Sequence, residues 1–213
     1  MATYEKGILG AFTGTVGTVV GANWRGKNVM RSRPRKTTRI PTELQMLQRE
    51  KFATVAQFLN PIRGVYNLYF GQKVATKSRY NLAVSYHIKE AVAWVNTVFK
   101  ITYNKVLISK GELQGLQDVA AVAVANTQLQ LSWTDNSGQG LALATDALLV
   151  VVYSDDLNLF EVFESYATRQ DVELTLQLAP YFATVPVQCW ATFVNNDRKL
   201  AATSTYVGAI TLL

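Results

Sequence analysis

The chain shows two hydrophobic periods, which change near residue 101. Before this point, apolar residues recur at helical spacing over residues 42–59 and about 78–95. After it, apolar and polar residues alternate, a pattern typical of strands with one buried face. We therefore expect an α+β protein with helices in the first half and strands in the second.

Proline and capping residues predict where the helices begin and end. Thr42 and Gln45, placed after Pro41, have the spacing of a capping box. Pro61 should end this helix or begin a second, short helix through Tyr69. A third helix is expected from about Ser78 to Val95. Its apolar face would consist of Val84, Ile88, Ala91, Val92 and Val95.

Seven strand candidates follow in the second half. They cover residues 119–125, 129–133, 147–153, 159–166, 172–178, 187–194 and 202–210. Turn residues separate several of them, as in Asn195-Asn196-Asp197. Seven short strands over roughly 100 residues predict a β-sandwich.

The first 33 residues are rich in glycine but do not favour a helix. Glycines at positions 7, 10, 14, 17 and 21 would each destabilise a helix by about 1 kcal/mol relative to alanine. The intervening Thr and Val residues prefer strands. We expect extended arms or a hairpin, with Gly26-Lys27-Asn28 near a turn and a returning strand over residues 28–33. In that strand Val29, Arg31 and Arg33 would share one face, opposite Met30.

The charge distribution divides the chain at a similar place. The net charge of the chain is +6, but it is unevenly distributed. Residues 1–110 are basic, with 18 Lys and Arg against four acids. Residues 111–213 are acidic, with three bases against eleven acids. We expect a basic glycine-rich and helical region followed by an acidic sandwich domain. The basic region could contact nucleic acid, the acidic half of a neighbouring subunit, or the acidic half of its own chain.

The densest basic segment is the predicted contact site for a polyanion or an acidic partner. It begins at the expected turn and continues through a connector bounded by prolines. Its residues are Arg25, Lys27, Arg31, Arg33, Arg35, Lys36 and Arg39.

Residues 21–28 match a phosphate-binding P-loop except at the last position. Asn28 stands where a Ser or Thr would bind magnesium. Val29 and Met30 favour a strand, and Pro34 interrupts the helix that a phosphate site requires. A hairpin turn is the preferred interpretation.

No other pattern predicts catalytic chemistry. His87 is the single histidine and lies on a predicted helix, where a packed or surface role is expected. Cys189 alternates with apolar residues and should lie in the sandwich core. The acids between residues 155 and 164 lack the spacing of a calcium loop. We predict no catalytic, cofactor-binding or metal-binding residues, and therefore a protein that is not an enzyme and requires no cofactor.

The C-terminal half resembles a fibronectin type III or immunoglobulin-like module. The resemblance rests on Trp133 at the end of the second strand, Tyr153 at the end of the third, and the Leu178-x-Pro180 pattern before the sixth. The usual corner tyrosine is absent, with Val187 or Cys189 near its place. The resemblance implies a seven-stranded sandwich.

Nearly the whole chain resembles an uncharacterised Bacteroidota family, the domain of unknown function 6266. The matching segments are Gly14–Gly21, Trp24–Gly26, Arg31–Pro34, Pro41–Gln45 with Arg49 and Phe52, Asn81–Tyr86 and Ser204–Gly208. The N-terminal arrangement also resembles small proteins of phage and prophage gene sets. This implies a structural role in a virion or similar particle, and the family offers no catalytic residues to transfer.

We expect a non-enzymatic assembly protein of phage or prophage type that binds copies of itself or neighbouring structural subunits. The alternative is a nucleic-acid-binding protein that uses the basic segment. A third possibility is ligand binding by the sandwich loops. No secretory leader is evident, and the uncharged run 7–24 is shorter than a membrane span. We therefore expect cytoplasmic synthesis, no membrane association and no small-molecule substrate.

Overall fold

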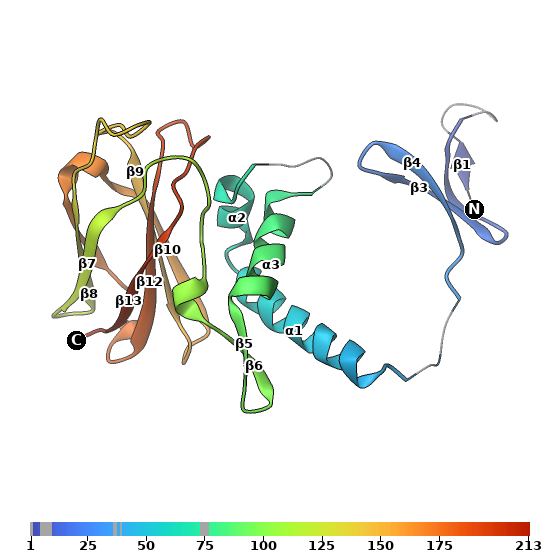
Figure 1. The fold of residues 1–213 in the computed structure, drawn as a ribbon, viewed down its shortest axis with the longest axis horizontal. Helices are drawn as coiled ribbons and strands as arrows, with labels where there is room; N and C mark the ends of the chain where they lie inside the picture. The colour runs from blue at the N-terminus through green and yellow to red at the C-terminus, as the bar shows by residue number, and fades with distance from the viewer. Residues whose placement is uncertain (1, 5–9, 36–37, 39, 73–76) are drawn as a thin grey trace. The chain divides into compact units, whose positions relative to one another are not determined.

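A computed structural model of the protein describes residues 2–4, 10–35, 38, 40–72 and 77–213 (Figure 1). Its contacts divide the chain into two compact units, Met1–Glu43 and Leu44–Leu213. The first unit contains one small sheet, and the second contains the helices and the remaining strands. The predicted boundary after residue 110, which follows the change of charge, remains a prediction.

The first unit is an antiparallel sheet in the order β1-β2-β3-β4. Its strands are β1 (Thr3–Tyr4), β2 (Phe12–Val16), β3 (Val19–Trp24) and β4 (Lys27–Ser32). The returning strand expected over residues 28–33 corresponds to β4, but it begins earlier, because Lys27 and Asn28 lie in the strand and not in the turn. The β3–β4 turn consists of Arg25 and Gly26, both with positive φ (51° and 79°). Positive φ at both central residues is what a two-residue type I′ hairpin requires.

Three helices precede most of the strands, which confirms the expected number in the described part of the chain. They are α1 (Glu43–Leu59), α2 (Arg63–Tyr69) and α3 (Arg79–Glu90). The first helix ends before Pro61, and Ser78 caps α3 by accepting a hydrogen bond from the Asn81 N–H at 3.2 Å. The capping box of Thr42 and Gln45 remains a prediction. None of these helices is long and apolar enough to cross a bilayer.

The third helix is shorter than predicted. It ends at Glu90, and residues expected on its last turn form a hairpin of β5 (Val92–Val95) and β6 (Val98–Ile101). Asn96 and Thr97 make the turn, with φ of 47° and 67°. The β-branched and aromatic residues around them favour strands, and this preference prevails over the helical spacing. A short helical turn, η1 (Tyr103–Lys105), follows the hairpin.

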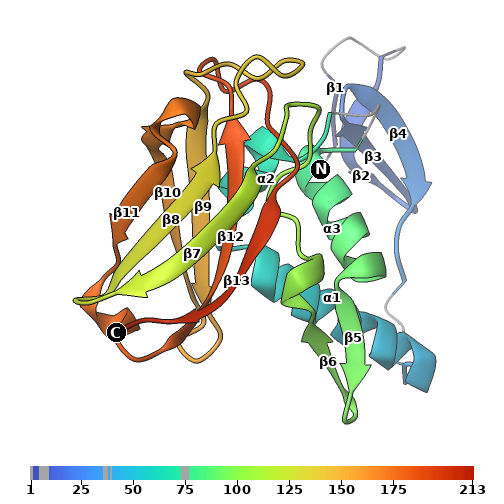
Figure 2. The same cartoon turned by 60° about the vertical axis from the view of Figure 1, so that its left-hand side comes forward.

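The rest of the second unit contains two antiparallel sheets, seen clearly in Figure 2. The first has the order β11-β8-β7, made of β11 (Glu173–Gln177), β8 (Gln128–Thr134) and β7 (Gln117–Val124). The second has the order β10-β9-β12-β13, made of β10 (Leu159–Thr168), β9 (Ala147–Ser154), β12 (Pro186–Val194) and β13 (Thr205–Thr211). Two short turns, η2 (Arg169–Asp171) and η3 (Pro180–Phe182), flank β11.

In the sheet β10-β9-β12-β13, the central strands β9 and β12 are covered on both faces. One face shares a core with the three-stranded sheet, in which Trp133 packs near Phe193 at a ring separation of 6.1 Å. The other face is covered by the helices, with Phe58 against Tyr153 at 5.1 Å. All eight residues of β9 are therefore buried. Continuous apolar strands such as β9 are typical of sheets covered on both sides.

Polar groups inside the second unit are hydrogen-bonded across distant segments. Ser109 donates to Ala202 O at 2.8 Å and lies 2.9 Å from the Thr192 hydroxyl. At Gly111 the backbone passes so close to the carbonyl of Ala201 that a Cβ atom would collide with it. These contacts join the segment after the helices to β12 and to the segment between β12 and β13.

Candidate assembly surface

The N-terminal sheet has almost no interior of its own. Among its described residues 10–35, only Gly21 is buried. The ring and carbonyl of Phe12 lie over Gly21, where a side chain of any size would collide with them. A sheet of this kind is marginally stable alone, because it removes little apolar surface from water.

The structure describes five of the seven predicted basic residues. Arg25 lies in the β3–β4 turn, Lys27 and Arg31 lie on β4, and Arg33 and Arg35 follow the strand. All five side chains are exposed. Lys36 and Arg39 lie outside the described residues.

Two of these bases share one face of the sheet with apolar side chains. Trp24 lies opposite Lys27 across β3 and β4, and Val20 lies opposite Arg31. The guanidinium of Arg25 lies 5.2 Å from the centre of the Trp24 ring, a cation–π distance. Trp24 is nevertheless 52% exposed. This face is therefore basic and partly aromatic.

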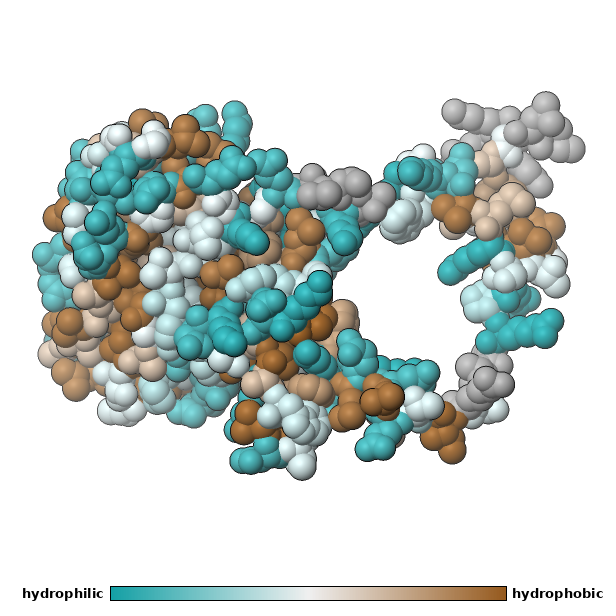
Figure 3. Space-filling view, viewed as in Figure 1, coloured by the Kyte–Doolittle hydropathy of each residue, from teal (hydrophilic) through white to brown (hydrophobic). Residues whose placement is uncertain are grey.

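The opposite face of the sheet carries exposed apolar side chains. Val16 is 49% exposed and Met30 is 70% exposed. Hydrophobic and hydrophilic residues are mixed over this sheet in the space-filling view (Figure 3). Both faces thus present groups that a neighbouring surface could cover.

Residues 21–28, which match most of a P-loop, form this hairpin and not a phosphate-binding turn. The chain continues after Gly26 as β4, so it has no helix N–H groups at that point to hold a phosphate. The structure agrees with the hairpin interpretation of this segment.

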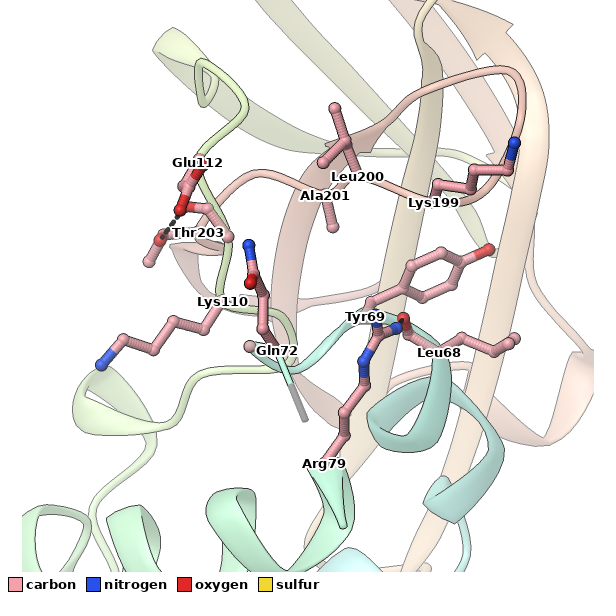
Figure 4. Close-up of a pocket in the computed structure, with 12 residues that line it drawn as sticks. Leu68, Tyr69, Gln72, Arg79, Lys110, Glu112, Lys199, Leu200, Ala201 and Thr203 are labelled. Carbon is pink, nitrogen blue, oxygen red and sulfur yellow. Dashed lines mark hydrogen bonds between the residues drawn. The ribbon is translucent and has the colours of Figure 1, made fainter. Parts of the chain in front are cut away.

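A pocket of about 480 Å³ in the second unit lies where α2, the 110–112 segment and the 199–203 segment meet (Figure 4). Three basic residues line this pocket, but their charged groups do not point toward a common position. Arg79 donates to the carbonyl of Leu68, Lys110 lies 5.8 Å from the Tyr86 ring, and Lys199 lies 3.9 Å from Asp197. In Figure 4 the ends of Lys110 and Lys199 point away from each other. The pocket therefore does not concentrate positive charge on one point.

A second pocket of about 310 Å³ is polar and aromatic. Its polar groups already bind one another, because the Tyr153 hydroxyl donates to Asn158 Oδ1 at 3.2 Å and lies 3.5 Å from Asp155 Oδ1. Burial raises the pKa of Tyr153 to about 12, with a further contribution from Asp155. In the part of the chain that the structure describes, no three His, Cys or acidic residues are grouped as metal ligands would be.

His87 and Cys189 both have packing roles. Burial lowers the pKa of His87 to about 4. Its Nδ1 donates to Ala83 O at 2.8 Å, while Nε2 accepts from the Leu107 N–H at 3.3 Å. Cys189 lies in the core between the sheets, as predicted, and burial raises its pKa to about 12. Neither group reaches solvent, since both residues have an exposed fraction of 0%.

The structure therefore defines a two-unit protein in which the predicted basic residues that it describes are exposed on and just after a small N-terminal sheet. The chain belongs to a family of unknown function, DUF6266, whose model matches residues 11–208. A search of curated proteins finds no match.

Several solved structures of fibronectin type III domains are similar to part of the chain. The FN5 domain of Drosophila Lar shares 10% identity over 48% of this chain and 96% of that domain, with a TM-score of 0.34. The FN1–FN3 domains of chicken CNTN1 share 10% identity over 48% of this chain and 34% of that one, with a TM-score of 0.39. The fn3 domain of the human collagen alpha-1(XX) chain shares 14% identity over 49% and 90%, with a TM-score of 0.35.

Proposed function

We propose that this chain is a non-enzymatic structural protein that assembles through contacts between subunits, as a phage-type virion or particle component would. One observation carries the proposal: the N-terminal sheet buries only Gly21 among its described residues 10–35. Such a sheet becomes stable when a neighbour covers it. We propose that the neighbour is another copy of the chain.

The charge of the two parts supports a contact between copies. The N-terminal unit has eight bases against two acids within residues 1–43, whereas residues 111–213 have three bases against eleven acids. Arg169 and Asp146 are buried together in an ion pair, so the excess of eight acids in residues 111–213 is carried by the remaining charged residues. Complementary charges favour association between copies and make it sensitive to salt.

We further propose that residues 111–213 form a seven-stranded sandwich of the fibronectin type III kind. The support is the division of its strands into the orders β11-β8-β7 and β10-β9-β12-β13, with a shared core. The sandwich would be the rigid, acidic module on which a neighbour's basic sheet docks.

Sedimentation velocity of the full chain at low and high salt tests the assembly proposal. We expect oligomers at low salt that dissociate as salt rises, because exposed charges are screened beyond about 8 Å at physiological ionic strength. The test variant changes five bases to glutamine: Arg25, Lys27, Arg31, Arg33 and Arg35. The matched control changes five other exposed bases: Arg49, Lys77, Lys89, Lys100 and Lys105.

The first variant should be monomeric, and the control should assemble like the unmodified protein. A full chain that stays monomeric at low salt and high concentration would refute the proposal. Equal loss of assembly in both variants would show that net charge, and not the N-terminal sheet, drives association.

Nucleic-acid binding is the second candidate function. The face that carries Lys27 and Arg31 also exposes Trp24, and aromatic rings beside bases can stack nucleobases. A gel-shift titration with duplex DNA and single-stranded RNA at 50 mM salt tests it. A shift that disappears in the five-glutamine variant would favour this function. No shift with either nucleic acid would remove it.

A further inference from the structure

The strand β10 forms an open edge of the four-stranded sheet. It stands last in the order β10-β9-β12-β13 and spans ten residues, Leu159–Thr168. In the described part of the chain, β9 is the only strand that pairs with it. Its side chains Leu159, Val162 and Tyr166 are 45%, 39% and 66% exposed. A long edge strand with exposed apolar side chains is a template for another strand.

The strand β4 is the matching open edge of the N-terminal sheet. It stands last in the order β1-β2-β3-β4, and all six residues from Lys27 to Ser32 are exposed. Its charged residues are Lys27 and Arg31, and it carries no acid. Two copies of β4 paired with each other would bring like charges together, which disfavours that pairing.

The charges of β10 have the opposite sign. Its charged residues are Glu161 and Glu164, and it carries no base. Glu164 is already engaged, because it accepts from the Tyr69 hydroxyl at 2.5 Å and lies 3.4 Å from Arg198. Glu161 has no basic partner among the described residues, and its Oε2 atom is buried without a hydrogen bond. A basic strand at this edge would compensate that carboxylate.

We propose that β4 of one copy adds to the free edge of β10 in a second copy, antiparallel, with Arg31 opposite Glu161. This register also places Met30 opposite Val162, so that two exposed apolar side chains pair on the other face. The inference rests on the proposed function and names the partner surface. Because the two edges belong to different sheets, the contact is heterologous and generates a ring or a filament.

A disulfide between two copies tests the register. One chain carries Met30→Cys, a second chain of different length carries Val162→Cys, and the mixture is oxidised and separated by mass. Directly opposite Cβ atoms in a strand pair lie about 4.5–5.5 Å apart, which small shifts bring within disulfide reach. The native Cys189 is fully buried and does not compete.

The matched control replaces Met30→Cys by Val29→Cys, whose side chain lies on the other face of β4. We expect mixed dimers with Met30→Cys in several-fold excess over the control. Each chain carries one introduced cysteine, so a mixed bridge can join only different copies. Equal yields, or no mixed dimer, would overturn the strand-addition inference.

A charge reversal gives an independent measurement. Arg31→Glu should weaken association by at least about ten-fold, because it places two carboxylates opposite each other. Adding Glu161→Arg to the same chain should restore association, whereas adding Glu173→Arg on β11 should not. Equal rescue by both second changes would overturn the pairing of Arg31 with Glu161.

The two proposals fail in distinguishable ways. A native chain that is monomeric at low salt refutes the proposed function together with this inference. Association that depends on salt, without preferential cross-linking of Met30→Cys to Val162→Cys, refutes only the strand addition and leaves assembly through another surface.

Discussion

Arg169 and Asp146 form an ion pair, with Nη2 3.0 Å from Oδ2, in which neither side chain is more than 1% exposed. The same guanidinium donates to Asn136 Oδ1 and to the carbonyl of Gln114, and it lies 4.0 Å from the centre of the Phe193 ring. Asp146 also accepts from the Leu143 N–H at 2.9 Å. One arginine thus joins four segments at one end of the two sheets.

Removing one partner of this ion pair should strongly destabilise the protein. Asp146→Ala leaves the Arg169 charge buried and uncompensated, which costs about 3–5 kcal/mol. Chemical denaturation monitored by tryptophan fluorescence measures the free energy of unfolding. The control, Arg198→Ala, removes the exposed partner of Glu164 and should change stability by about 1 kcal/mol or less. Similar losses in both variants would contradict the structural role of the buried pair.

His87 should make stability depend on pH. Its pKa is lowered from 6.5 to about 4 by burial, so the unfolded chain binds a proton that the folded chain does not. Stability should therefore fall as pH decreases from about 6.5 to 4, by about 2–3 kcal/mol between pH 7 and pH 4.5.

His87→Gln, which keeps hydrogen-bonding capacity without titrating, provides the comparison. The difference in unfolding free energy between pH 7 and pH 4.5 should be smaller in this variant. An unchanged pH dependence would show that His87 is not the neutral, buried group described by the structure.

Gly111→Ala should destabilise the protein through a backbone collision. The new Cβ would meet the carbonyl oxygen of Ala201, which cannot rotate away as a side chain can. We expect a loss of about 1–3 kcal/mol in thermal or chemical unfolding. The control is Gly64→Ala in α2, where space is open. It should be neutral or stabilising by up to about 1 kcal/mol.

Cys189 should react very slowly with thiol reagents in the folded protein. Burial raises its pKa to about 12, and the thiolate is the reactive form. At pH 8, labelling by a thiol reagent should be on the order of 10³-fold slower in the native protein than in denaturant. An added Met30→Cys thiol, exposed on β4, provides a fast-reacting control in the same molecule. Rapid labelling of native Cys189 would contradict its position in the core.

Local patterns predicted many elements but missed one. The seven candidate strands correspond closely to β7–β13, because alternation and turn residues act over a few neighbours. The hairpin of residues 92–101 was missed because Val84, Ile88 and Val92 also fit a helical repeat. The run 147–153 was predicted as a strand, but its burial on both faces was not, because no local signal identified the helices as its cover.

The candidate surface was predicted only in part. Arg31 and Arg33 were predicted as contact residues from the density of basic residues around them, and charged side chains of this kind are mostly exposed. The open edge at β10 could not be predicted, because the alternation of its side chains is the same in a central strand and in an edge strand. The order of strands in the sheet decides which backbone groups remain unpaired.

The sequence by itself determined most helix and strand segments, a hairpin turn near Gly26, and the division of charge, because these depend on residues close together in the chain. The tertiary structure alone decided that His87 is buried, that Arg169 meets Asp146 across 23 residues, and that β4 and β10 are open edges. Burial and pairing at such distances depend on how the whole chain packs, since a local pattern specifies which residues prefer to be covered but not what covers them.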